Sequence, residues 1–222
     1  MTRTLLVDTN RAAYPIYKAL SALDHDVWVV GGKTSETLAK LSPNYISLDY
    51  SDTESLSALV EEHAFDYLVP GCTDVSYNAC AFINSGRYPG LDTPDTTRLI
   101  NDKVAFRRTA SALGLSIPRV LTETSSLELD AIIIKPADAF SGRGIQVVRE
   151  PNPSTIESAL SGARAASGTG QVLIEEFVSG QLYSHSAFLS RGKILADFFV
   201  REDCSTSPFA VDVSCLTQDL PA

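Results

Sequence analysis

Apolar residues form four short runs within the first seventy positions, and each run ends at polar residues, glycine or proline. The runs that we interpret as strands cover residues 4–8, 27–30, 45–48 and 65–69. Helical periodicity lies between them; Ile16, Leu20 and Leu23, for example, fall on one face of a helix. Another helix is expected to start at Ser51, because Glu54 completes a capping box with it. Strands that alternate with helices favour a parallel, doubly wound sheet.

The pattern of the chain changes beyond residue 90. Thr93 followed by Pro94 is typical of a helix start. Asn101 is interpreted as the N-cap of a second helix, which runs from Asp102 to about Leu113. Apolar runs then return, and the connections between them are rich in glycine. The strands predicted here cover residues 131–135, 145–148, 171–177, 182–189, 193–200 and 209–216.

The first two strands of this later part are joined by a loop that contains glycine. Such a connection favours antiparallel pairing of the strands 131–135 and 145–148. Ser154 and Glu157 form a capping pattern, which predicts a helix that runs to about Ala166. The order strand, strand, helix, strand therefore indicates a second lobe of a different architecture from the first.

The expected fold class is α/β, and the chain is expected to form two domains. A first domain over residues 1–92 would contain the doubly wound parallel sheet. A second domain over residues 93–222 would contain a small α+β lobe at about 120–180 and the start of a C-terminal lobe at 181–222. The boundary lies where the alternation of strands and helices stops.

Composition describes a chain of ordinary globular character. With 222 residues, 44% hydrophobic and 20% charged, it can bury a core in one or two domains. The net charge of -9 argues against nucleic acid or an anionic membrane as partner, although a local group of cations can still hold one anionic ligand. No apolar run approaches the roughly 20 residues of a membrane span, and the N-terminus has no secretory pattern. We expect a soluble, cytoplasmic protein.

The four cysteines show no spacing that is typical of metal ligands. We interpret them as reduced, small hydrophobic side chains of a cytoplasmic protein. They are Cys72, Cys80, Cys204 and Cys215. No metal site is therefore assigned to them.

Two nucleotide-binding patterns are incomplete in the first domain. Gly32-Lys33-Thr34 resembles the end of a P-loop, but the first glycine of that motif is replaced by Val27, inside a predicted strand. The turn after the first strand contains no glycines, so the backbone there cannot easily approach a pyrophosphate. The chemistry of the chain is therefore expected in the second domain.

Two lysines of the second domain are candidate phosphate ligands. Lys103 lies at the start of a predicted helix, where the helix dipole opposes a cation unless an anion offsets it. Lys135 ends an apolar strand and would present a compact positive charge at a cleft. Ile133 shares its face and would pack on a base. The alternative is that both lysines are merely solvated.

Two short segments add to these lysines. Ser141, Gly142, Arg143 and Gly144 follow the Lys135 strand, where a loop of backbone N–H groups can surround phosphate oxygens. The alternative is a turn that needs glycine only for positive φ. The segment 175–178 ends a strand and could read the edge of a purine with its backbone, or could be an ordinary strand exit. It contains Glu175, Glu176, Phe177 and Val178.

Taken in order, these motifs resemble the ATP-grasp superfamily, in particular its members similar to carbamoyl-phosphate synthase and biotin carboxylase. The resemblance covers about residues 3–200. It implies that Lys103 and Lys135 contact the phosphates of ATP and that residues 141–144 form a mobile flap. It also implies that residues 175–178 read adenine, with Glu176 and Val178 as backbone contacts. Such proteins typically use ATP and Mg²⁺ to activate a carboxylate as an acylphosphate, which an amine or similar nucleophile then attacks.

The sequence departs from the family pattern at two places. The acidic residue that holds the ribose, seven positions after the first hinge glutamate, is replaced by Leu182, which cannot accept a hydrogen bond. Gln181 and His185 are the candidate substitutes. The metal ligands of the family, a Glu and a Glu-x-Asn strand, have no counterpart after Val200. The remaining carboxylates are Asp203, Asp212 and Asp219, none of them in the matching context.

The function therefore has more than one interpretation. The first is an ATP-dependent carboxylate–amine ligase, either truncated or completed by a partner chain, with homodimerisation also possible. The second is a non-catalytic nucleotide-binding module that uses the same cleft, and the third is an unrelated binding domain. The two substrates are not identified, and no catalytic residue is assigned. Asp74 and Tyr77, which follow the fourth strand, lie where open α/β sheets place ligands.

Overall fold

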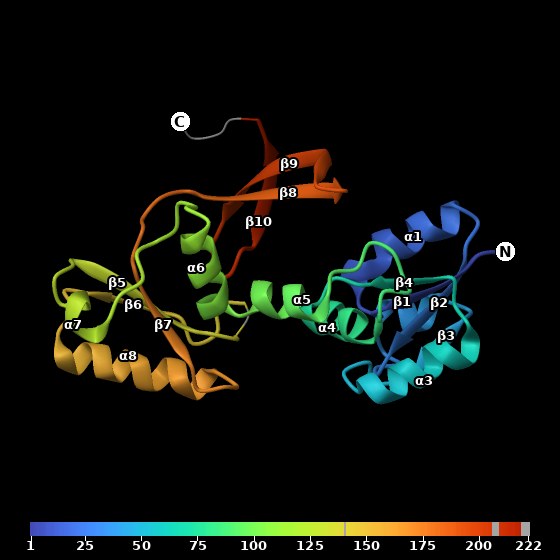
Figure 1. Ribbon diagram of the computed structural model, residues 1–222, viewed down its shortest axis with the longest axis horizontal. Helices are drawn as coiled ribbons and strands as arrows, with labels where there is room; N and C mark the ends of the chain where they lie inside the picture. The colour runs from blue at the N-terminus through green and yellow to red at the C-terminus, as the bar shows by residue number, and fades with distance from the viewer. Residues whose placement is uncertain (140, 206–208, 219–222) are drawn as a thin grey trace. The chain divides into compact units, whose positions relative to one another are not determined.

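The computed structural model describes residues 1–139, 141–205 and 209–218, and its chain divides into two compact units, Met1–Asn101 and Asp102–Ala222 (Figure 1). The predicted domain boundary lies before residue 93, whereas helix α5 (Pro94–Asn101) belongs to the first unit and packs against α4 (Asp74–Ile83). No helix of the described residues is long and apolar enough to cross a membrane.

The first unit is built on a four-stranded parallel sheet with the order β3-β2-β1-β4. The strands are β1 (Arg3–Val7), β2 (Asp26–Gly31), β3 (Tyr45–Ser47) and β4 (Tyr67–Pro70). The helical segments are η1 (Arg11–Ala13), α1 (Tyr14–Ala22), α2 (Thr37–Leu41), α3 (Thr53–His63), α4 and α5. This arrangement confirms the predicted α/β class with an N-terminal parallel sheet.

Alternate residues of β1 feed two separate cores, because successive side chains of a strand point to opposite faces. Leu5 and Val7 pack in one cluster with residues of α3 and α4, including Leu56. Leu6 packs in the other cluster with residues of α1 and α2, including Leu38. Both faces of the sheet are thus covered by helices, which explains the nearly continuous apolar runs of the strands.

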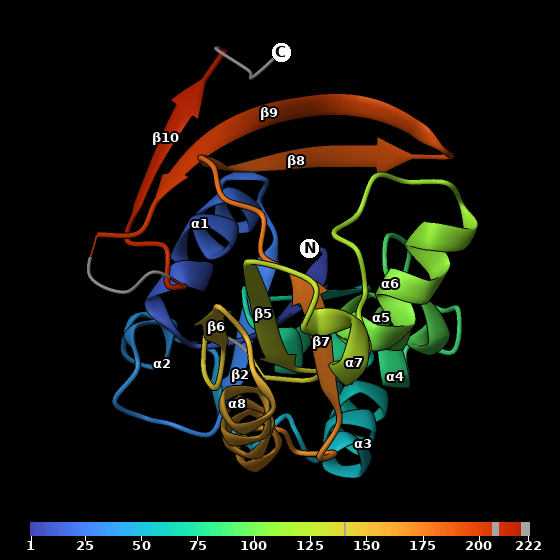
Figure 2. The same cartoon turned by 90° about the vertical axis from the view of Figure 1, so that its left-hand side faces the viewer.

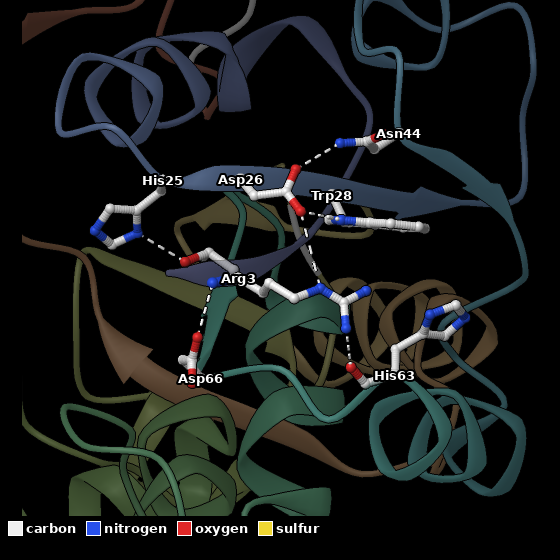
Figure 3. A network of polar contacts seen from close by, with 8 residues as sticks. Arg3, His25, Asp26, Trp28, Asn44, His63 and Asp66 are labelled. Carbon is white, nitrogen blue, oxygen red and sulfur yellow. Dashed lines mark hydrogen bonds and ion pairs between the residues drawn. The ribbon is translucent and has the colours of Figure 1, made fainter. Parts of the chain in front are cut away.

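A polar network joins the amino-terminal ends of these strands (Figure 3). The Arg3 guanidinium lies 5.2 Å from the ring centre of Trp28 and 5.3 Å from that of Phe65. It donates a hydrogen bond to the carbonyl of His63 and lies 3.8 Å from the carboxylate of Asp26. The network stands at the edge opposite the one where parallel sheets bind ligands, so we interpret it as structural.

Two predicted helix caps of this part of the chain were wrong by one residue. Asp52, and not Ser51, caps α3, because its carboxylate accepts from the N–H of Ser55 while the Ser51 hydroxyl donates to Asp49. Asn101 is the last residue of α5, and Asp102 caps the helix that follows. In both cases an aspartate one position later outcompetes the expected cap.

The second unit begins with α6 (Lys103–Ala112) and a three-stranded antiparallel sheet with the order β6-β5-β7. The strands are β5 (Ala131–Pro136), β6 (Gln146–Arg149) and β7 (Val172–Glu176), and the antiparallel pairing of β5 with β6 is confirmed. Helix α8 (Pro153–Ala166) covers one face of the sheet, and a short α7 (Glu123–Ser126) precedes β5. The N-cap of α8 is Asn152 rather than the predicted Ser154.

A second antiparallel sheet follows, with the order β10-β9-β8. Its strands are β8 (Leu182–Ser190), β9 (Lys193–Asp203) and β10 (Val213–Thr217), and Figure 2 shows the chain passing from β7 into β8. The last strand begins at Val213, whereas the sequence predicted a strand from residue 209. The strands β8 and β9 confirm the predicted hairpin around Arg191-Gly192.

Candidate functional site

A cavity of about 700 Å³ lies between the two antiparallel sheets of the second unit. Strand β5 contributes Ile133 and Lys135, the segment after β7 contributes residues 177–182, and the end of β9 contributes Glu202 and Asp203. The rest of the lining consists of Ile145, Arg149, Cys204, Phe209 and Val211. One cavity therefore offers apolar walls, a lysine, an arginine and two carboxylates.

The glutamate that begins the predicted hinge is the most deeply buried charge of this region. Glu175 is 0% exposed, and its carboxylate accepts from the ammonium of Lys135 at 2.6 Å. Its second oxygen accepts from Nε of Arg107, whose side chain is 21% exposed. A buried carboxylate needs such partners, since burial without them is very costly. The Glu175 carboxylate is therefore not a surface group, as an ordinary strand exit would have it, and the predicted contact of its segment with a purine stays a prediction.

The ion triad of Arg107, Glu175 and Lys135 carries one net positive charge, because two cations flank one carboxylate. Lys135 is the member that lines the cavity, and its side chain is 19% exposed. The triad fixes the direction of the ammonium while leaving an excess of positive charge at this end of the cavity. That arrangement suits an anionic ligand.

Lys103 holds the beginning of the glycine loop. It is the first residue of α6, and its ammonium donates to the carbonyl of Ala139 at 2.8 Å and to that of Ala137 at 3.4 Å. Its backbone N–H also donates to the carbonyl of Ala137 at 3.2 Å. Two carbonyls thus supply the negative end of a dipole that offsets the unfavourable position of a cation at a helix start.

The predicted flap forms a turn with three left-handed residues. Ser141, Gly142 and Gly144 have φ values of 54°, 72° and 74°. A Cβ atom at Gly142 would lie 2.6 Å from the carbonyl oxygen of Phe209, so only glycine allows this approach. Arg143 between them is exposed. The turn lies against Phe209, which lines the cavity, while residues 141–144 are not part of the described lining. Phe140 lies outside the described residues.

The hinge segment leaves the sheet where the cavity begins. The N–H of Glu176 donates to the carbonyl of Arg119 at 3.0 Å, and its carboxylate accepts from the N–H of Arg119 at 2.9 Å. The ladder to β5 ends at Glu176, so the backbone of Val178 lies outside it. Phe177 and Val178 line the cavity. Of the predicted binding residues, the structure thus brings Ile133, Lys135, Phe177 and Val178 to one surface.

Sequence reasoning missed Arg107 and Glu202. Arg107 lies four residues after Lys103, so both cations fall on one face of α6, and this spacing was an available signal. Glu202 belongs to the cavity only through the pairing of β9 with β8, which places it opposite Leu182. No local motif marks that position.

The described residues do not form a dedicated metal site. They contain no group of three or more His, Cys, Asp or Glu side chains in suitable positions. Of the two carboxylates in the cavity, Glu202 accepts from the Ser184 hydroxyl, and Asp203 accepts from Gln181 and lies 3.4 Å from Arg201. Mg²⁺ is commonly held by one or two carboxylates together with substrate phosphates. Each carboxylate already has a partner within the protein and keeps further lone pairs, and no chemical step is derived through a metal.

Comparison with known proteins agrees with this geometry. Residues 103–183 match the family described as carbamoyl-phosphate synthase L chain, ATP binding domain. A formate-dependent phosphoribosylglycinamide formyltransferase of Methanocaldococcus jannaschii is 30% identical over 143 residues, which cover 60% of this chain and 36% of that protein. The enzyme of the same name from Rhodococcus jostii is 27% identical over 190 residues, covering 80% and 46% of the two chains.

Solved structures show the same fold. An N5-carboxyaminoimidazole ribonucleotide synthetase in an ADP complex has a TM-score of 0.73 at 14% identity, covering 92% of this chain and 55% of that chain. An L-amino acid ligase from Bacillus licheniformis has a TM-score of 0.71 at 16% identity, covering 100% and 56%. Residues 103–183 thus resemble the ATP-binding domain of the carbamoyl-phosphate synthase L chain, and the chain shares its fold with ligases of the ATP-grasp type. It spans about half the length, or less, of the relatives it matches.

Proposed function

We propose that the cavity of the second unit binds ATP and that the chain forms part of an ATP-dependent ligase. The observation that carries this proposal is the Lys135 ammonium, which lines the cavity and is held by a buried carboxylate that Arg107 also neutralises. The excess positive charge at this end suits the phosphates of a nucleotide. Lys103 supports the same end indirectly, because it holds the loop that follows β5.

The base would lie against the other end of the same cavity. Ile133 and Phe177 supply apolar surface, and the backbone of Val178 is outside the sheet ladder and can meet the edge of a purine. ADP and MgADP occur in the solved structures of similar fold, which supports a nucleotide as ligand. The residues assigned to ATP are therefore Ile133, Lys135, Phe177 and Val178, with Lys103, Glu175, Glu176 and residues 141–144 as their supports.

The reaction class follows from what such ligases do. A carboxylate oxygen of the acid attacks the γ-phosphorus of ATP, the bond to the bridging oxygen breaks, and ADP leaves. The amine then attacks the acyl carbon of the acylphosphate, phosphate leaves, and the amine loses a proton. In this scheme the chain's residues bind and orient the phosphates, because phosphoryl transfer depends on positioning and charge neutralisation.

Replacing Lys135 tests the site directly. We expect Lys135→Ala to weaken ATP binding by about 1–3 kcal/mol, as for the loss of a charge-assisted hydrogen bond. The measurement is isothermal titration calorimetry with ATP, and the matched control is Lys193→Ala, an exposed lysine at the start of β9. An ATP affinity that is unchanged in Lys135→Ala would refute the assigned site.

Turnover is a separate measurement. Incubation with ATP, Mg²⁺ and pools of carboxylic acids and amines should release ADP if the ligase chemistry is present in the chain tested. Binding without ADP release in a full-length protein would instead favour a non-catalytic nucleotide-binding module. The two functions would use the same cavity to bind ATP and would differ only in whether a reaction follows binding.

A further inference from the structure

The cavity has a negatively charged wall as well as a positive one. Glu202 and Asp203, at the end of β9, line it together with Leu182 at the start of β8. In the β8–β9 ladder, Leu182 lies directly opposite Glu202. Residues opposite each other in an antiparallel pair project from the same face of the sheet, so the Glu202 carboxylate and the Leu182 side chain share one surface.

Local hydrogen bonds orient this carboxylate. The Ser184 hydroxyl, two residues after Leu182 on the same face, donates to Oε1 of Glu202 at 2.8 Å. The Gln181 side-chain amide donates to the backbone carbonyl of Glu202 at 2.7 Å. A carboxylate has two oxygens and about four lone-pair sites, so Glu202 keeps capacity to accept from a ligand.

The two residues that the sequence offered as ribose contacts are placed differently. His185 projects from the opposite face of β8, where its ring stacks on Phe199 with centroids 4.1 Å apart and its Nε2 lies 2.9 Å from Asp197. Gln181 lines the cavity, but its amide donates to the backbone and side chain at the end of β9. Neither residue places a carboxylate where the family pattern has its ribose-binding acid. Glu202 does so, because it lies opposite Leu182 on the same face of the sheet.

The negative charge of Glu202 determines which part of a bound nucleotide can lie next to it. Phosphates are repelled by a carboxylate and attracted to the Lys135 end, and the purine edge is matched by the hinge backbone. The sugar hydroxyls are the remaining donors, and a carboxylate accepts from hydroxyls strongly. We propose that Glu202 accepts a hydrogen bond from a ribose hydroxyl of the bound nucleotide and thereby makes the site selective for nucleotides that carry the sugar hydroxyls; this rests on the proposed ATP site.

The test compares ATP with 2′,3′-dideoxy-ATP, which lacks both hydroxyls, by calorimetry in the presence of EDTA. The unmodified protein should bind ATP about tenfold or more tightly than the dideoxy compound, as for a charge-assisted hydrogen bond. Glu202→Ala should weaken ATP binding by the same factor and leave the affinity for the dideoxy compound unchanged. Adding Leu182→Glu to that variant should restore part of the preference, because it returns a carboxylate to the same face.

Asp197→Ala is the matched control, since this carboxylate lies on the same strand and on the opposite face. It should leave both affinities unchanged. If Glu202→Ala fails to fold, Glu202→Gln serves instead, and its neutral acceptor should retain only part of the preference for ATP.

Three outcomes would overturn the proposal. Equal affinity of the unmodified protein for the two nucleotides would show that no hydroxyl is read. If Glu202→Ala weakened the binding of both nucleotides equally, the carboxylate would act on a part of the nucleotide other than the sugar hydroxyls, or on the structure of the site. Weakening that occurs only when Mg²⁺ replaces EDTA would identify Glu202 as a metal ligand. If neither the unmodified protein nor Lys135→Ala bound either nucleotide, the ATP site itself would be refuted.

Discussion

The two antiparallel sheets of the second unit contrast in how they bury their residues. In the sheet β6-β5-β7, Ile132, Ile134 and Ile174 pack with α8 in a closed core. In the sheet β10-β9-β8, large apolar residues stay at the surface; Leu195 is 71% exposed and Leu216 is 76% exposed. The first sheet, called the closed sheet below, is therefore stabilised by its own core. The second, called the open sheet, depends more on the pairing of its strands.

The same contrast applies to the carboxylates of the site. Glu175 belongs to the closed sheet and is held by two cations in the absence of solvent. Glu202 belongs to the open sheet, is half-buried, and is oriented by a hydroxyl on the neighbouring strand. A buried ion triad fixes the position of a charge, whereas a half-buried carboxylate remains available to a ligand. Two acidic residues of the same unit can therefore serve different purposes: buried Glu175 orients the Lys135 ammonium, whereas Glu202 lines the cavity.

Removal of the buried carboxylate should have the largest effect. Glu175→Ala leaves Lys135 and Arg107 close together in a largely buried site, and losing one partner of a buried pair typically costs about 3–5 kcal/mol. The measurement is the free energy of unfolding from urea denaturation followed by circular dichroism. Glu202→Ala, in the open sheet, should stay within about 1 kcal/mol of the unmodified protein.

A second variant separates charge from packing. Glu175→Gln keeps the shape of the side chain and loses its charge, so it should destabilise less than Glu175→Ala while still weakening ATP binding. Similar unfolding free energies for Glu175→Ala and Glu202→Ala would contradict the contrast between the two sheets. In that case the ion triad would contribute no more than a surface group.

The glycines of the two hairpin turns offer the next comparison. Gly142 lies in the turn between β5 and β6 and Gly192 in the turn between β8 and β9, with φ values of 72° and 73°. Alanine at either position suffers the left-handed strain of about 1–2 kcal/mol. A Cβ at Gly142 also meets Phe209, whereas a Cβ at Gly192 has no neighbouring atom within 4 Å among the described residues.

We therefore expect Gly142→Ala to destabilise the protein more than Gly192→Ala. It should also weaken ATP binding severalfold, because Phe209 forms part of the cavity wall. Gly192→Ala should leave the ATP affinity unchanged. Urea denaturation and calorimetry measure the two effects, and equal ATP affinities of the two variants would show that the contact of Gly142 with Phe209 does not shape the site.

Local pattern was sufficient to predict most of the fold. The parallel sheet, the antiparallel pair β5–β6 and the hairpin β8–β9 follow from short apolar runs and from the length of the connections between them. Helix α4 was not predicted individually, although Thr73 caps it and its residues Ala79 and Cys80 are buried. Small residues such as these give a weak periodic signal, because they differ little from a loop in hydropathy.

The candidate site was predictable only in part, since two of its features arise from tertiary contacts. The partner of Glu175 on α6 requires the packing of a helix on a strand 68 residues away in sequence. Glu202 requires the register of the hairpin, and a shift between Phe188 and Leu189 changes that register. Counting back from the turn pair Ser190 and Lys193 would place Arg201 opposite Leu182. A one-residue bulge thus decides whether a cation or a carboxylate faces the cavity.

The smallest expected effect is a dependence on acid at the base of the glycine loop. Asp138 follows β5, and the hydroxyl of Ser167 and the N–H groups of Thr169 and Gly168 donate to its carboxylate at 2.6, 3.0 and 3.2 Å. These bonds, that of Ser167 first, hold the pKa of Asp138 below its usual value. Its stabilising contribution is therefore present above the ordinary pKa of an aspartate and is lost as the pH falls through the lowered one.

Asp138→Asn should remove this dependence, since an amide does not titrate. The fall in melting temperature between pH 6 and pH 3, an interval of about three units around the usual pKa of aspartate, should be smaller in Asp138→Asn than in the unmodified protein. Ser167→Ala, which removes the strongest of the three donors and keeps the carboxylate, should give an intermediate slope. If both variants lose stability with acid as steeply as the unmodified protein, the acid sensitivity of the closed sheet arises elsewhere, and Asp138 serves only to shape the turn.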